Sequence, residues 1–194
     1  MGALPVPRFS VEEYLELDRS AEVQSEFHDG VMFPITAVTW ERSEINGSVW
    51  SKLKTALRGK PCKVASAAVR VRVRPSKFVI PDLMIVCGEP AFADKVRDTV
   101  TNPRVIVEIL SPSTADYDYG EKFILYRGLP SFEEYLLVSQ DHARVEVFRK
   151  TSDGRWMLTT YLGLDAVVPI ESVGVDLALA EVYDGVEFPP SKDD

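Results

Sequence analysis

Two carboxylates stand inside runs of apolar residues, and they are the side chains of this sequence best suited to carry chemistry. Asp82 interrupts residues 78–87 and Glu108 interrupts residues 105–110. Burying an unpaired carboxylate costs several kcal/mol, so each needs a cationic partner, a raised pKa or a metal ion. Two such carboxylates on successive core strands predict a hard cation held by oxygen ligands, and therefore a metal-dependent enzyme.

Each of these carboxylates also has a structural interpretation. Asp82 follows a proline, which is confined to strand edges and bulges, so Asp82 could equally be a turn residue. Glu108 could form a buried ion pair with Arg104 or Lys122. Lys122 and Asp118 are four residues apart on a predicted helix, and pairs at that spacing are usually exposed salt bridges.

Lys122 gives the pair of carboxylates a candidate cation. It lies one helical turn after Asp118 and one turn before Tyr126, so the three residues share a face. An ammonium directed toward two carboxylates and a metal can steady a hydroxide and neutralise developing phosphate charge. Tyr126 alone is more typical of a core residue, and Glu26 alone carries little information. Their occurrence together with Asp82, in this order along the chain, indicates a functional site.

The elements that must position these residues are those of an α/β or α+β domain. Ser10 is expected to cap a helix that runs to about Asp18, and Asp29-Gly30 is a hairpin signal between two strands. Helical spacing of apolar residues predicts a helix over residues 40–57. Two or three strands are expected within residues 62–87, a loop over residues 88–103 and a strand over residues 104–110.

The second half continues the same alternation. A helix over residues 117–127 precedes three strands, residues 134–139, 144–149 and 156–162, and a terminal helix over residues 177–183. The last six residues are expected to form a frayed tail. Nothing divides the chain, so residues 1–194 are expected to form a single domain.

Composition and charge limit the class of protein. With 194 residues, 45% of them hydrophobic and 27% charged, the chain is expected to be globular and soluble. No apolar run approaches the ~20 residues of a membrane span, and residues 1–8 lack the apolar core of a secretory signal, so a cytoplasmic location is expected. Cys62 and Cys87 lie in apolar stretches and are expected to be free and buried.

The net charge of −8 argues against a general nucleic-acid coat protein. It does not argue against a nuclease, because a cluster of catalytic carboxylates is acidic until metal binds. Arg70, Arg72 and Arg74 alternate along one predicted strand and so share a face. That face is expected to be solvated, with a phosphate-binding stripe as the alternative.

Taken in order, these motifs resemble the Uma-type restriction endonucleases, a family of the PD-(D/E)XK nuclease superfamily. The resemblance lies in Pro81-Asp82, in the string from Val107 to Thr114, and in Glu26 before the Asp-Gly turn. Further matches are Asn46, Pro103, Asp118, Lys122, Tyr126 and residues 134–138. The resemblance covers nearly the whole chain. It implies a restriction-endonuclease-like core, a mixed β-sheet flanked by helices, with the site at the ends of its central strands.

The function that this resemblance implies is a Mg²⁺- or Mn²⁺-dependent DNA endonuclease that acts as a homodimer, with the apolar strands after residue 134 as the candidate interface. Carried over one by one, the functional residues are the metal ligands Asp82, Glu108 and the carbonyl of Ile109, the catalytic residues Glu26 and Lys122 beside them, and the supporting residues Asp118 and Tyr126.

Two positions depart from the pattern of the family. The superfamily's lysine normally falls two positions after the second acid, where this chain has Leu110, so Lys122 is the substitute. The family often has a histidine near the start of the long helix, where this chain has Arg42. Arg42 joins the three alternating arginines as a candidate for nucleic-acid contact.

A second function remains open at this stage. A nucleic-acid-binding or regulatory interaction protein of the same fold, with weak or no turnover, is favoured by the acidic net charge and by Leu110. The intact acidic set with Lys122 favours the enzyme, because a decayed site has no physical reason to keep buried carboxylates.

Overall fold

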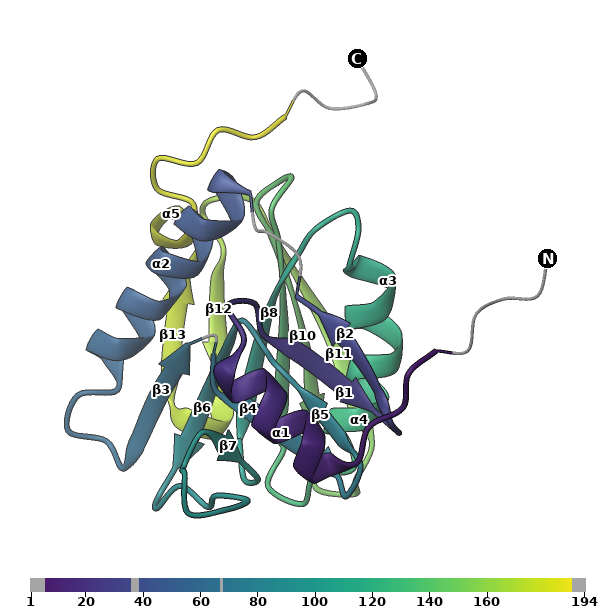
Figure 1. Ribbon diagram of the computed structural model, residues 1–194. Coiled ribbons are helices and arrows are strands. Elements are labelled where there is room, and N and C mark those ends of the chain that lie inside the picture. Colours follow the sequence, from purple (N-terminus) through teal and green to yellow (C-terminus); the bar gives the residue numbers. More distant parts are fainter. Residues whose placement is uncertain (1–5, 36–38, 67, 190–194) are drawn as a thin grey trace.

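A mixed six-stranded sheet forms the centre of the computed structural model, which describes residues 6–35, 39–66 and 68–189 (Figure 1). The sheet contains β3 (Cys62–Ser66), β6 (Leu83–Cys87), β8 (Val105–Leu110), β9 (Glu134–Ser139), β10 (Arg144–Lys150) and β11 (Trp156–Leu162), in the order β11-β10-β9-β8-β6-β3. Strands β8 and β9 run parallel, and the other neighbours are antiparallel. The predicted mixed α/β (α+β) class is confirmed.

A second sheet of five strands lies beside the first. It contains β1 (Ser25–His28), β2 (Val31–Pro34), β4 (Arg70–Arg74), β5 (Lys77–Val79) and β7 (Thr99–Val100), in the order β2-β1-β5-β4-β7. The β1–β2 hairpin turns at Asp29 and Gly30, whose φ angles of 48° and 100° suit the primed turns that Asp-Gly favours. The predicted hairpin is therefore confirmed.

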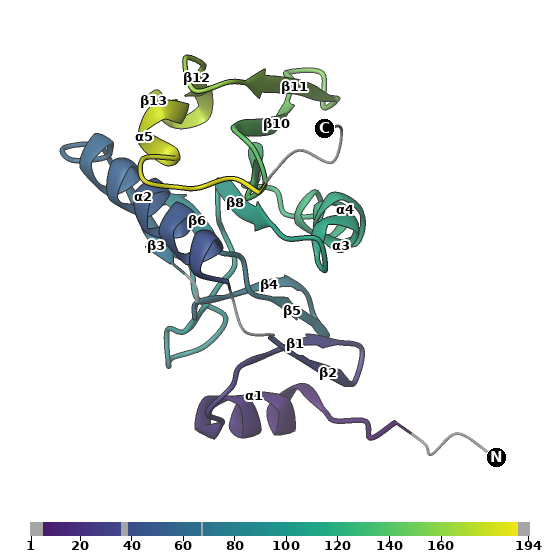
Figure 2. The ribbon, with the colours of Figure 1, turned by 90° about the horizontal axis from the view of Figure 1, so that it is seen from above.

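Helices cover both faces of the six-stranded sheet (Figure 2). On one face α2 (Trp40–Ala56) packs with α5 (Leu179–Val182) and with the small sheet of β12 (Val167–Ile170) and β13 (Val175–Ala178), which are joined by a 3-10 turn, η2 (Glu171–Val173). On the other face lies the helical run of α3 (Ala115–Tyr117), a π-helical turn η1 (Asp118–Lys122) and α4 (Phe123–Tyr126). The helices predicted over residues 40–57 and 117–127 are confirmed.

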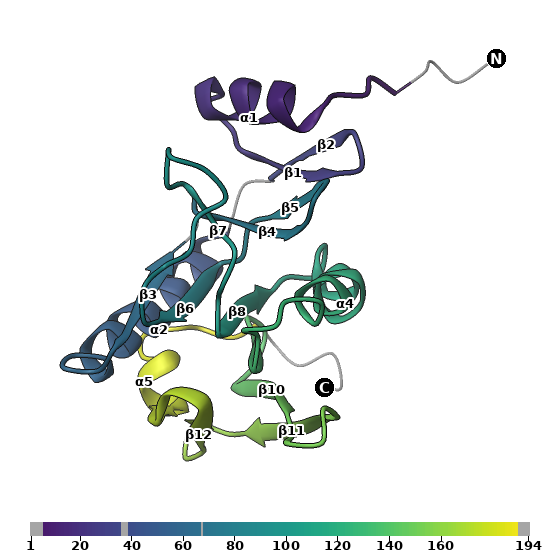
Figure 3. The same ribbon diagram turned by 90° about the horizontal axis from the view of Figure 1, so that it is seen from below.

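The first helix, α1 (Val11–Ser20), lies on the outer side of the five-stranded sheet (Figure 3). It begins with a capping box, in which Ser10 Oγ accepts from the Glu13 amide and Glu13 Oε2 accepts from the Ser10 amide. Tyr14 stacks on Phe27 of β1 with ring centroids 4.6 Å apart. The predicted helix is confirmed and ends two residues later than expected.

Helix α1 also determines how exposed the arginines on β4 are. Arg70 is only 2% exposed and pairs with Asp18 of α1, and the Arg72 guanidinium lies 5.5 Å from the centroid of the Phe78 ring. Arg74 alone of the three is exposed. The prediction that they share a solvated face is wrong, because α1 covers most of that face.

The apolar run of residues 78–87 is two strands, not one. β5 ends at Val79, β6 begins at Leu83, and the two belong to different sheets. Asp82 therefore lies in the break that carries the chain from one sheet to the other. Residues 62–87 hold four strands rather than the predicted two or three.

Two other predictions are corrected. Cys62 and Cys87 form a disulfide and are not free, because β3 and β6 pair antiparallel in a register that sets the two residues opposite each other. The helix expected over residues 177–183 is one turn, α5, because Leu177 belongs to β13. The predicted tail lies outside the described residues apart from Pro189, and no helix in the described ranges is long and apolar enough to cross a membrane.

Candidate active site

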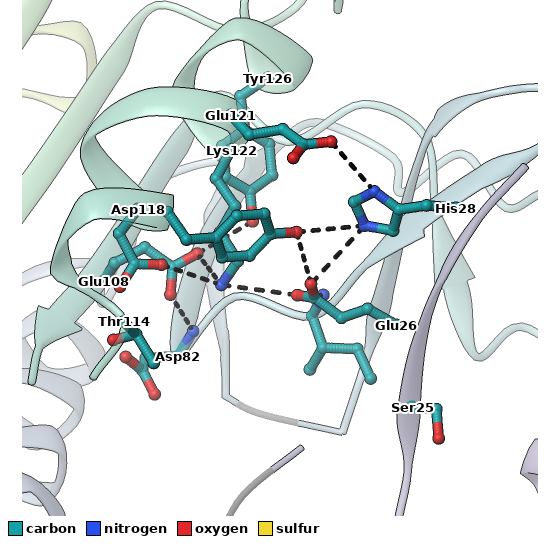
Figure 4. Close-up of polar contacts among 12 residues, drawn as sticks. Ser25, Glu26, His28, Asp82, Glu108, Thr114, Asp118, Glu121, Lys122 and Tyr126 are labelled. Carbon is teal, nitrogen blue, oxygen red and sulfur yellow. Dashed lines mark hydrogen bonds and ion pairs between the residues drawn. The ribbon is translucent and has the colours of Figure 1, made fainter. Parts of the chain in front are cut away.

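Four elements bring the predicted acidic residues and Lys122 together where the two sheets meet. Glu26 comes from β1, Asp82 from the residue before β6, Glu108 from the middle of β8, and Lys122 from the end of the π-helical turn. Figure 4 shows the Lys122 ammonium between the carboxylates of Glu26 and Glu108. A pocket of about 460 Å³ is lined by Glu26, Asp82 and Lys122 and by Arg42 of α2, whereas Glu108 is fully buried and does not line it.

Lys122 is the central cation of the cluster. Its Nζ donates to Glu108 Oε1 at 3.0 Å and lies 3.2 Å from Asp118 Oδ1 and 3.5 Å from Glu26 Oε1. The side chain is only 8% exposed, so the exposed Asp118–Lys122 salt bridge considered from the sequence is wrong. Burial lowers the pKa of Lys122, but the three carboxylates outweigh it and hold the pKa above its usual value.

Glu108 is the most deeply buried acid of the cluster, with no exposed surface. Its Oε1 accepts from Lys122 Nζ and from the Tyr126 hydroxyl, each at 3.0 Å, and its Oε2 accepts from the backbone amide of Asp82 at 3.2 Å. Burial raises the pKa of Glu108, Lys122 opposes that rise, and the nearby carboxylates of Asp118 and Asp82 add to it. Arg104 pairs with Glu133, so Lys122 is the partner of Glu108.

Asp82 is held between a strand and a helix. Its Oδ2 accepts from the backbone amide of Ile109 at 2.7 Å, and both of its oxygens accept from Nη2 of Arg42, at 2.9 and 2.8 Å. The Arg42 side chain is 14% exposed, and its Nε is buried without a hydrogen-bond partner among the described residues. Asp82 is thus paired with a cation that sequence analysis considered only for nucleic-acid contact.

Glu26 anchors the side of the pocket formed by the five-stranded sheet. Its Oε1 accepts from the backbone amide of Ile80 at 2.9 Å, and its Oε2 accepts from the Tyr117 hydroxyl at 2.7 Å. Burial alone would raise the pKa of Glu26, but the Lys122 ammonium, the nearby His28 ring and the hydrogen bond from Tyr117 lower it to about 2. Glu26 is therefore ionised at neutral pH.

Three residues of the pocket were not predicted from the sequence. The Tyr117 hydroxyl lies 3.1 Å from Nε2 of His28, and Nδ1 of His28 lies 3.3 Å from Glu121. Tyr117 and His28 are 89 positions apart, and neither has metal-ligand spacing to any other residue, so no local pattern could have joined them. Glu121 is an exposed acid on a helix, and nothing in the sequence distinguishes it from other such residues.

Asp118 is buried but poorly satisfied. Within the described part of the chain neither carboxylate oxygen has a hydrogen-bond partner, although Oδ1 lies within ion-pair distance of Lys122. Burial raises the pKa of Asp118, against the opposing charge of Lys122. A buried carboxylate with free oxygens beside a pocket favours a further cation there.

The arginines of β4 stand apart from this site. Arg70 and Arg72 lie beneath or beside α1, and none of the β4 arginines lines the pocket. Of the four arginines considered for nucleic-acid contact, the structure brings Arg42 alone to the acidic cluster.

The sequence matches a protein family along most of its length. Residues 11–180 match the family described as "Uma2: Putative restriction endonuclease". Two similar proteins come from Synechocystis sp. (strain ATCC 27184 / PCC 6803 / Kazusa). The uncharacterized protein slr1290 is 30% identical over 185 residues, which cover 95% of this chain and 96% of that protein. The uncharacterized protein sll1609 is 32% identical over 157 residues, which cover 80% and 89%.

The fold also matches a solved structure, that of a "putative nuclease belonging to DUF820" from Anabaena variabilis ATCC 29413. The TM-score is 0.74 at 16% sequence identity, and the match covers 92% of this chain and 99% of that one. At this identity the likeness establishes a shared fold. The predicted restriction-endonuclease-like core is confirmed.

Proposed function

The chain belongs to the family described as "Uma2: Putative restriction endonuclease", and from this membership and the pocket's buried charges we propose that it is a divalent-metal-dependent endonuclease of DNA. The reaction is hydrolysis of a phosphodiester bond, with Asp82 and Glu108 as metal ligands and Glu26 and Lys122 as their catalytic neighbours. Asp118 and Tyr126 support Lys122 and Glu108. These roles rest on the geometry of the cluster and on the family resemblance.

One observation carries the proposal, the imbalance of buried charge under the pocket. The four carboxylates of Glu26, Asp82, Glu108 and Asp118 face the two cations Arg42 and Lys122, a formal excess of two negative charges. Buried charge without compensation is costly, so the metal-free cluster must take up protons or a cation. A divalent ion supplies the missing two charges.

The donor chemistry fits magnesium or manganese. Within residues 6–35, 39–66 and 68–189 no three His, Cys, Asp or Glu side chains form a ready metal cage. Mg²⁺ does not need one, because it binds through one or two carboxylates and keeps several waters. Asp82 and Glu108, with the carbonyl of Ile109, supply donors of that kind, and Asp118, whose Oδ2 has no hydrogen-bond partner among the described residues, lines the same pocket.

A bound divalent cation would polarise the phosphodiester and lower the pKa of a coordinated water. The protein's own residues prepare the site for it. Tyr126 and Lys122 orient Glu108, and the Lys122 ammonium remains to neutralise charge that develops on the phosphate. Glu26 holds Lys122 from the opposite sheet, with Tyr117 fixing Glu26 in turn.

The proposal predicts cleavage of supercoiled plasmid DNA that requires Mg²⁺ or Mn²⁺ and stops in EDTA. Calorimetric titration with Mn²⁺ should give an affinity at least about tenfold weaker in Asp82→Asn, because one of two ligand charges is lost. Metal binding without cleavage of DNA or RNA would favour the binding protein without turnover. Equal Mn²⁺ affinity in wild type, Asp82→Asn and Glu108→Gln would remove the metal site itself.

We also propose a homodimer whose interface lies at β11. Strands β9 and β10 lie inside the six-stranded sheet, whereas β11 is its edge. Leu158 and Leu162 alternate onto one face of β11 and are 48% and 63% exposed. An exposed apolar edge strand is a ready site for pairing with a second copy.

Light scattering at tens of micromolar should therefore give the mass of a dimer. The double variant Leu158→Lys with Leu162→Lys should give a monomer, because charge would be buried at the pairing edge. Met157→Lys, on the opposite face of the same strand, is the matched control and should stay dimeric. A monomeric mass for the wild type, with and without DNA, would contradict the proposal.

A further inference from the structure

Arg42 occupies the carboxylate oxygens that a metal would need. Its Nη2 donates to Oδ1 and to Oδ2 of Asp82 at 2.9 and 2.8 Å, and Oδ2 also accepts from the Ile109 amide at 2.7 Å. The side chains are 14% and 9% exposed, so water screens the pair only in part. Asp82, the first of the proposed metal ligands, thus already has a cationic partner in Arg42.

The contact is not the strongest one that an arginine can make. A guanidinium usually binds a carboxylate through two nitrogens, each donating to its own oxygen. Here one nitrogen bridges both oxygens, and Nε is buried without an acceptor among the described residues. A buried donor left unpaired is costly, so this arrangement leaves Arg42 free to exchange its contact for another.

We propose that Arg42 competes with the divalent cation for Asp82 and thereby sets the metal affinity of the site. The inference rests on the proposed metal-dependent function. Nη2 of Arg42 contacts both oxygens of Asp82, so the guanidinium must release at least one of them before a cation can be held there. Lys122 does not compete in this way, because it contacts only Oε1 of Glu108, and Oε2 accepts from a backbone amide and carries no cation.

The size of the effect follows from the fraction of molecules in which Arg42 has left Asp82. The apparent dissociation constant equals the intrinsic one divided by that fraction. A minor state populated at about 1–10% weakens metal binding by about 10–100-fold. Removing the guanidinium should restore the intrinsic affinity.

The experiment is calorimetric titration of the full-length, metal-free chain with Mn²⁺ alone. Arg42→Gln should bind Mn²⁺ at least about tenfold more tightly than wild type. Lys77→Gln is the matched control, because Lys77 pairs with Asp29 and Glu121 at the rim and removes one positive charge without touching Asp82. Its affinity should stay within about threefold of wild type, since Lys77 pairs with other acids and does not contact Asp82.

The outcomes separate this inference from the proposed function. Equal or weaker Mn²⁺ binding in Arg42→Gln, with binding intact in wild type, overturns the competition and leaves the metal site standing. Absence of Mn²⁺ binding in both overturns the competition and the metal dependence together. The gain must also vanish when Asp82→Asn is added to Arg42→Gln. Circular dichroism checks folding, and Arg42→Met, which keeps the aliphatic stem, replaces Arg42→Gln if that variant does not fold.

Discussion

Replacing Glu108 by glutamine is expected to lower the rate of DNA cleavage on the order of a thousandfold and to weaken Mn²⁺ binding, because a metal-ligating charge is worth several kcal/mol in the transition state. The carboxylate accepts from Lys122 and Tyr126 on one oxygen and from the Asp82 amide on the other. A glutamine has only one accepting oxygen, so no orientation of its amide satisfies all three donors. Initial rates on plasmid DNA at saturating Mg²⁺ measure the loss.

The fold should survive this change. Burial raises the pKa of Glu108, which means that the fold disfavours its charge, and a neutral amide removes that cost. Lys122 keeps Asp118 and Glu26 as partners. The melting temperature of Glu108→Gln should therefore stay close to that of the wild type, although its cleavage rate falls steeply.

Glu134→Gln provides the matched control. Glu134 is equally buried, in the neighbouring strand β9, and its Oε1 accepts from Arg149 at 2.6 Å. It pairs in register with Val105, the first residue of β8, whereas Glu108 pairs with Leu137. This variant should melt at a lower temperature yet cleave within a few-fold of wild type. Cleavage by Glu108→Gln within about tenfold of wild type would exclude it as a metal ligand.

Local patterns were sufficient for most of the fold. The Ser10 capping box, the Asp29-Gly30 turn and the helical spacing of Ile45, Val49 and Leu53 each act within a few residues, and each element formed where expected. The spacing of Lys122 from Asp118 likewise placed both on one side of the helix. Interactions between residues that are close along the chain can therefore be predicted from the sequence.

Contacts between distant residues were not readable in the same way. An apolar run does not reveal that its strands belong to different sheets, so the break at Asp82 was invisible. The Cys62–Cys87 disulfide depends on the register of two strands, and the burial of Arg70 depends on where α1 packs. Each of these three features depends on tertiary packing and not on local sequence preference.

The residues of the candidate site also differ in whether the sequence could predict them. Asp82 and Glu108 were found because a carboxylate in an apolar run is unusual, whereas Glu26 and Asp118 were found from their order along the chain and the family resemblance. Arg42, Tyr117 and His28 were not assigned their contacts, because surface-like arginine, tyrosine and histidine residues are common and their partners lie far along the chain.

Replacing Lys122 by methionine is expected to slow cleavage a hundredfold or more, on the order of 3 kcal/mol of barrier or greater. Leu110, where the superfamily resemblance would expect a lysine, can carry no charge, and Lys122 is the cation that contacts Glu108. The variant also leaves Glu26, Glu108 and Asp118 without their shared partner. Breaking a buried ion pair costs about 3–5 kcal/mol of unfolding free energy, so melting should fall as well.

A loss of stability makes the cleavage rate alone ambiguous, and a second buried cation resolves it. Arg70 is as buried as Lys122 and pairs with Asp18 away from the pocket. Arg70→Met should lose a similar amount of unfolding free energy, measured by urea denaturation. Its cleavage rate per folded molecule should match that of wild type, whereas that of Lys122→Met should not.

Metal affinity then distinguishes a catalytic lysine from one that only holds the ligands in place. An ammonium is not a ligand, and its removal takes a positive charge from beside Glu108, so Mn²⁺ affinity in Lys122→Met should not fall. A rate loss at undiminished metal affinity means that Lys122 acts on the phosphate or the attacking water. A parallel loss of both means that Lys122 positions Glu108, and a full rate per folded molecule removes Lys122 from the catalytic set.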